Sequence, residues 1–144
     1  MPPLTSDRNT PAMAGDLRSG PIAAGETIHG GALVMRDATG HLVAGATALN
    51  LTGVGRAEEA ADNAAGADDD KSLSYRPGIF RFRNSAAAGL VTIAETGTVC
   101  FAVDDQTVAK TDGTGTRSKA GVVEEVDALG VWVRLDEALT RTTS

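Results

Sequence analysis

The sequence predicts a mainly β protein: a small β-barrel or β-sandwich domain with short loops or helical turns, preceded by an extended N-terminal arm. Three observations support this fold class. A short apolar strand, a small-residue stretch and an alternating strand occur twice in the same order. Aromatic residues make up only 3% of the 144 residues, and four of the five prolines lie within the first 25. A repeated strand pattern with few large side chains is typical of a narrow barrel or thin sandwich.

Residues 1–25 are predicted to form the arm. Small and polar residues separate its prolines, and no period of 2 or 3.6 runs through it. Fully extended, the arm would reach about 80 Å, at about 3.3 Å per residue. An arm of this kind gains ordered structure by adding to another chain, so we expect it to bind a partner. The arm residues assigned to that contact are Pro2, Pro3, Leu4, Pro11, Met13 and Leu17.

Residues 26–138 are predicted to form the β-rich domain. Its first copy of the repeat covers 31–37, 51–59 and 73–82, and its second covers 97–105, 120–127 and 130–135. The turn Asp37-Ala38-Thr39-Gly40 between two apolar stretches predicts a hairpin. The Ala-rich, acidic segment 56–71 is expected to be a surface excursion between strands. Residues 139–144 are polar and predict a flexible tail.

Charge and composition exclude several classes of partner. The formal net charge of −6 argues against nucleic acid, whose binding needs clustered Lys and Arg. No stretch approaches the roughly 18 apolar residues of a membrane span, and the N-terminus has no secretory pattern. We therefore expect neither a membrane nor a nucleic-acid partner, and synthesis in the cytoplasm of the producing cell.

No residue cluster in the sequence predicts catalysis, a metal site or a cofactor. Cys100 lies in an apolar run and is expected to be a buried small hydrophobe. Asp68-Asp69-Asp70 lacks the spaced ligands of a calcium loop and is expected to be solvated. His29 and His41 lack zinc-binding spacing, and neither a nucleophile elbow nor a phosphate-binding loop occurs.

The strand 79–83 carries the candidate surface site. Period 2 directs Phe80 and Phe82 inward and Arg81 and Arg83 outward, with Arg76 nearby. Two interpretations remain open. The three arginines form a basic stripe that docks on an acidic partner surface, or they only solvate the outer face of a half-buried strand.

Seven short motifs, taken in order, resemble the capsid cement proteins of tailed phages, over roughly residues 25–136. The first half is also similar to the lambda-type head decoration protein, and the second half departs from it by being longer and repeating the unit. The motifs are Gly31-Ala32-Leu33-Val34, Gly40-His41-Leu42-Val43, Gly53-Val54-Gly55, Pro77-Gly78-Ile79-Phe80-Arg81, Gly97-Thr98-Val99, Gly121-Val122-Val123 and Val131-Trp132-Val133-Arg134-Leu135.

This resemblance implies a β-tulip-like domain on the outside of an icosahedral head, where it stabilises neighbouring major capsid subunits. It also implies a homotrimer, an arm that reaches onto the major capsid protein, and no enzymatic activity. The alternative function is a receptor- or carbohydrate-binding module, or the base of a head fibre. That alternative needs an exposed aromatic platform, for which only Trp132 and Tyr75 are available.

Overall fold

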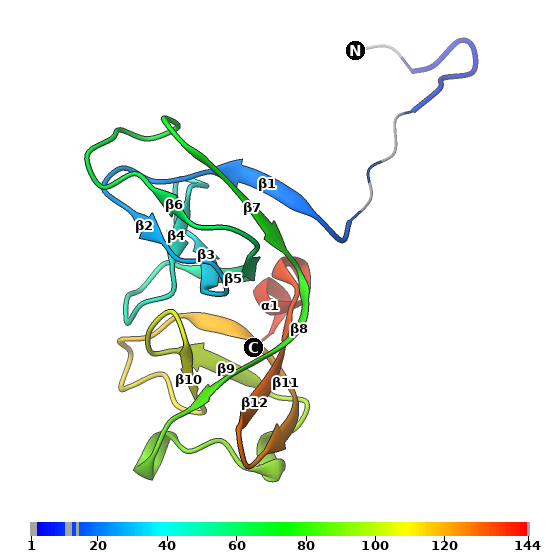
Figure 1. The fold of residues 1–144 in the computed structure, drawn as a ribbon. Helices are drawn as coiled ribbons and strands as arrows, with labels where there is room; N and C mark the ends of the chain where they lie inside the picture. The colour runs from blue at the N-terminus through cyan, green and yellow to red at the C-terminus, as the bar shows by residue number, and fades with distance from the viewer. Residues whose placement is uncertain (1–2, 11–12, 14, 144) are drawn as a thin grey trace.

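The computed structural model describes residues 3–10, 13 and 15–143, and it is mainly β. Two five-stranded units lie one after the other along the chain and stack on each other (Figure 1). The first unit comprises β1 (Arg18–Pro21), β3 (Leu33–Arg36), β4 (Leu42–Ala44), β5 (Thr52–Ala57) and β7 (Ser72–Arg76), in the order β1-β7-β5-β3-β4. The second comprises β8 (Gly78–Asn84), β9 (Val99–Ala102), β10 (Thr107–Ala109), β11 (Lys119–Asp127) and β12 (Gly130–Leu135), and it is a closed barrel in the order β10-β8-β12-β11-β9. The remaining elements are the small sheet β2 (Thr27–Ile28) and β6 (Ala61–Asp62), the 3₁₀ turns η1 (Ala87–Gly89) and η2 (Ile93–Glu95), and helix α1 (Glu137–Thr142).

The two units have the same topology. When the five strands of a unit are numbered along the chain, the first strand lies next to the fifth, followed by the fourth, the second and the third. This order is the same in both units, and strands that are neighbours in it pair antiparallel. The second unit closes because its third strand, β10, pairs in parallel with its first strand, β8. At the matching place in the first unit, a single parallel bridge joins Ile22 to Leu42. The two units are therefore tandem copies of one strand topology, which closes into a barrel in the second unit.

The β-bulges of the two units also coincide, at positions 66 residues apart. In the first unit Gly55 lies opposite Val34 and Gly53 opposite Met35, so Val54 bulges out of the pairing. In the second unit Ala120 bulges in the same way, between Lys119 and Gly121. The sequence predicted an approximate repeat of three strands, and the structure shows five strands per unit with the same order and the same bulge position.

The predicted first copy was wrong at its end, because it ran through to Phe82. The first unit ends at Arg76, and β8 is already the first strand of the second unit. Pro77 lacks the N–H that would continue the pairing, and Gly78 has φ +146°, which bends the chain into the next barrel.

The predicted arm boundary at residue 25 was also wrong. β1 pairs with β7 over four residues, and Ile22 is completely buried. Gly20 lies where a Cβ atom would be only 3.1 Å from Leu42 Cδ1, so a small residue is needed at this position in the strand. The arm therefore ends near Leu17, and a proline-containing stretch belongs to the sheet.

Strand β3 lies between the two hydrophobic cores. Val34 and its neighbour Ala32 pack into the core of the first unit, whereas Leu33 and Met35 pack into the core of the second. All four side chains are buried, which explains why this strand is continuously apolar rather than alternating. Cys100 is buried in the second core, as predicted.

The backbones of the two units come into close contact where β5 meets β11. A Cβ atom added to Gly53 would lie 1.8 Å from the carbonyl oxygen of Ala120, well inside any allowed contact. Gly53 is next to the first-unit bulge and Ala120 is the second-unit bulge residue. The two equivalent irregularities therefore pack against each other.

The predicted flexible tail was wrong, because residues 137–142 form α1. Asp136 caps this helix by accepting a hydrogen bond from Leu139 N at 3.0 Å, and Thr140 is fully buried. Glu137 accepts hydrogen bonds from Arg36 of the first unit (2.9 Å) and from Arg141 (2.8 Å). A helix of six residues is stable only through such tertiary contacts, which the composition of a polar tail does not reveal.

Gly53→Ala is expected to lower the free energy of unfolding by about 2 kcal/mol or more, because the methyl group would force β5 and β11 apart. Urea denaturation of the full chain measures this. Gly30→Ala is the matched control, since its Cβ would have no neighbour closer than 3.7 Å. Equal stability of Gly53→Ala and Gly30→Ala would contradict the close contact between the units.

Glu137→Gln is expected to lower Tm at pH 7 and to lower it progressively less as the pH falls below 4.5. Burial pushes the pKa of Glu137 up, but hydrogen bonds from Arg141 and Arg36 outweigh this, so the pKa lies below its ordinary value of 4.5. The stabilisation is therefore present above pH 4.5 and is lost as the pH falls through the lowered pKa. Tm measured from pH 3 to 7 tests this, and a difference that persists unchanged at pH 3 would contradict it.

Candidate functional site

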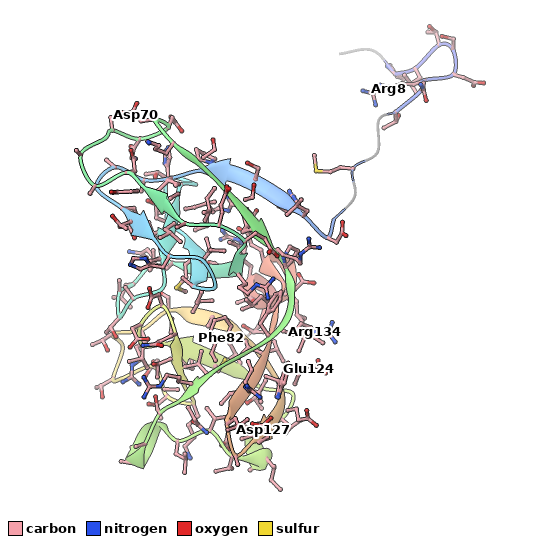
Figure 2. All side chains as sticks on the ribbon, viewed as in Figure 1. Arg8, Asp70, Phe82, Glu124, Asp127 and Arg134 are labelled. Carbon is pink, nitrogen blue, oxygen red and sulfur yellow. The ribbon has the colours of Figure 1, made fainter. Side chains whose placement is uncertain are left out.

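The arm presents exposed apolar side chains. Leu4 is 71% and Met13 78% exposed, Leu17 is about half exposed, and Pro3 is also exposed. The arm projects away from both units, and Arg8 lies far from them (Figure 2). Its one ion pair to the units, within the described residues, joins Asp16 at its base to Arg76 at 3.5 Å. Pro2 and Pro11, which were also assigned to partner binding, lie outside the described residues.

The second candidate surface is the outer face of the second unit, formed by the outward side chains of β8, β11 and β12. The inward and outward assignment of β8 is confirmed: Phe82 is buried, Phe80 packs half-buried on the core, and Arg81 and Arg83 are exposed. The labelled residues of β11 and β12 lie along one side of this unit (Figure 2). The outward residues are Ile79, Arg81, Arg83, Glu124, Glu125, Trp132 and Arg134.

The predicted basic stripe is a mixed-charge surface. Arg76 donates a hydrogen bond to Glu58 at 2.7 Å. It lies at the end of β7 in the first unit, whereas Arg81 and Arg83 lie on β8. Arg81 lies 3.9 Å from the Asp127 carboxylate. Arg83 alone among the three arginines has no ion pair within the described part of the chain. The sequence pattern missed these partners because they come from other strands.

Asp127 organises the outer face, and sequence reasoning did not single it out. Its Oδ2 accepts a hydrogen bond from Trp132 Nε1 at 2.8 Å, and its Oδ1 accepts from the backbone N–H groups of Leu129 and Gly130. The Trp132 indole and these backbone donors lower the pKa of the Asp127 carboxyl. Arg81 lies 5.4 Å above the Trp132 ring. The detectable signal was an aspartate that opens a tight turn five residues before a tryptophan.

The acidic triplet binds the protein's own chain. Asp68 accepts from Ala24 N at 2.7 Å, Asp70 accepts from Ala67 N at 2.9 Å, and Asp69 lies 3.1 Å from His41 Nε2. Among the described residues no group of three His, Cys, Asp or Glu side chains is arranged to hold a metal ion. Burial raises the pKa of the Cys100 thiol to about 12, so this thiol is unreactive.

A cavity of about 470 Å³ opens beside the base of the arm, between β7 and α1. Arg18, Tyr75, Glu137 and Arg141 contribute to its wall. Its carboxylate Glu137 is already bonded to Arg141 and Arg36. The lining within the described chain includes no serine, cysteine or histidine that could act as a nucleophile with a base.

No protein-family model matches the chain, and neither a curated protein nor a solved structure matches it. None of the helices in the described residues is long and apolar enough to cross a membrane. Function must therefore be inferred from the two surfaces, the exposed arm and the outer face.

Arg83→Glu is expected to leave the free energy of unfolding within about 0.5 kcal/mol of the wild type, because Arg83 is exposed and unpaired in the described structure. Arg81→Glu is the comparison: it places a carboxylate beside Asp127 and removes the cation above Trp132, so it should destabilise measurably. Thermal denaturation of both variants measures the difference. Equal melting temperatures for the two variants would contradict this account of the outer face.

Proposed function

We propose that the protein is a structural virion protein that binds the outer surface of an icosahedral phage head and cements neighbouring major capsid subunits. The observation that carries this proposal is the arm, whose Leu4 and Met13 side chains are 71% and 78% exposed. An exposed apolar segment of this kind is typical of a chain that becomes ordered on a partner. The motif resemblance to capsid cement proteins supports the same partner.

The geometry suits attachment at two points. The arm up to Leu17 reaches about 50 Å when extended, at about 3.3 Å per residue. The outer face of the second unit supplies a separate surface, in which hydrogen bonds hold Trp132 and Arg134 in place. Two modest contacts on different subunits bind more tightly together than either does alone, because the second contact forms intramolecularly. A protein that does this around a shell ties its subunits together.

The remaining parts of the proposal follow from the capsid setting. The partners are the major capsid protein and further copies of the chain in a homotrimer, on the outside of the virion. The proposal involves no catalysis and no cofactor, membrane or nucleic acid. The net charge of −6 supports the last point, since phosphate binding relies on clustered cations.

A second candidate function is a carbohydrate- or receptor-binding module of the virion surface. Trp132 favours it, because its ring is held on the outer face and is only half-buried. Tyr75, the other aromatic considered for this role, is 4% exposed and packs in the first core. A binding platform would therefore rest on Trp132 alone.

Deleting residues 2–15 is expected to abolish binding to expanded empty heads of the protein's own phage while leaving Tm unchanged. β1 and Asp16 remain in this variant, so both units keep their contacts. Co-sedimentation with the heads measures binding. The double variant Leu4→Ser with Met13→Ser is the matched control for length and should weaken binding strongly. Head binding by the deletion variant equal to that of the intact chain would overturn the proposed role of the arm.

A further inference from the structure

Because the two units share one topology, each outward residue of the second unit can be compared with the residue at the equivalent position of the first. Equivalent registers align Ser74 with Trp132 and Ser19 with Arg81, while Glu59 aligns with Glu125. The first unit folds with serines at the outward positions where the second unit has a tryptophan and an arginine. The barrel therefore does not require Trp132, and another explanation is needed for an aromatic residue at this outward position.

The Trp132 ring forms one wall of a pocket of about 320 Å³. Ile79 forms a second apolar wall and is 41% exposed, and the carboxylates of Glu124 and Glu125 line the rest. Hydrogen bonding to Asp127 at 2.8 Å fixes the ring before any ligand arrives. The pocket is therefore preorganised, with apolar walls and an acidic rim.

The two carboxylates are not equivalent. Glu124 is neutralised by Arg134 at 2.8 Å, the counterpart of the Glu58–Arg76 pair in the first unit. Glu125 has no cationic partner within the described residues. Its counterpart in the first unit, Glu59, accepts a hydrogen bond from the backbone N–H of Ser74 at 3.0 Å. The second unit thus holds a carboxylate beside an aromatic ring without a matching cation.

We propose that this pocket binds an arginine or lysine side chain presented by an extended segment of a partner protein. The aliphatic stem of such a side chain packs on Ile79 and Trp132, and Glu125 supplies the opposite charge. A sugar fits less well, because it carries no positive charge to pair with Glu125. The inference goes beyond the cementing role, since it specifies the ligand side chain whatever particle the protein covers.

The chain contains one tryptophan, so its single indole N–H signal in a ¹H–¹⁵N NMR spectrum reports on this pocket directly. The probe is the acetylated and amidated pentapeptide Ala-Ala-Arg-Ala-Ala, titrated into the full chain. We expect a saturable shift of the Trp132 indole signal at millimolar concentration. The corresponding peptide with Glu in place of Arg should give no saturable shift.

Matched variants separate the pocket from general acidity. Glu125→Gln should weaken the peptide response about two- to fivefold, as the loss of one exposed ion pair predicts. Glu59→Gln, the same change at the equivalent position of the first unit, should leave the response unchanged. An absent shift, an equal response to the Glu peptide, equal effects of the two variants, or a shift with methyl glucoside alone would each overturn the proposal. None of these titrations uses phage heads, so their outcome is independent of the cementing experiment.

Discussion

The backbone contact between β5 and β11 is the constraint on which the rest of the structure depends. Gly53 lets β5 approach Ala120 so closely that no side chain fits between them. This approach brings β3 between the two cores, where Leu33 and Met35 complete the core of the second unit. A residue with a side chain at position 53 would separate the units and leave part of β3 without a partner. The two units therefore pack as one body through β3 and the β5–β11 contact.

Both units have glycines at equivalent positions where the backbone leaves no room for a side chain or has a positive φ. A Cβ atom at Gly55 would lie 2.7 Å from the carbonyl oxygen of Arg76, and one at Gly121 would lie 2.4 Å from that of Arg134. Gly31 and Gly97 both have φ +85° and both donate to the fourth strand of their unit at 2.8 Å. The glycines that the two units share maintain the strand arrangement, whereas the outward residues that differ between the units lie on the surface. In the proposed function, one unit anchors the arm and the other carries the Trp132 pocket.

The sequence was informative wherever local patterns determine structure. Alternation placed Phe82 inside and Arg81 outside, turn residues located the hairpin at residues 37–40, and the repeat indicated a duplicated three-strand unit. Long-range effects escaped it. A proline-containing stretch became β1 because Ile22 fills a core, and a polar tail became α1 because Arg36, 101 residues away in the chain, bonds Glu137. Composition records neither kind of contact.

In the candidate site, too, local features could be predicted from the sequence and long-range contacts could not. Exposed arm residues such as Leu4 and Met13 could be identified from the sequence, since nothing nearby offered them a core. The ion pairs of Arg81 and Arg134 could not be predicted from the sequence, because their carboxylate partners come from a neighbouring strand and turn. The pocket at Trp132 needed the fold, which alone brings Ile79 and Glu125 to the same place.

The central claim, that the two five-stranded units unfold cooperatively because the β5–β11 contact joins them, is tested most directly by urea unfolding followed at two residues. Tyr75 is the only tyrosine and lies in the first core, and Trp132 is the only tryptophan and lies on the second unit. NMR signals of the Tyr75 ring and the Trp132 indole report each unit separately. The account predicts that both signals change in one transition with the same midpoint and slope. Two transitions with different midpoints would show that the barrels unfold independently and would contradict it.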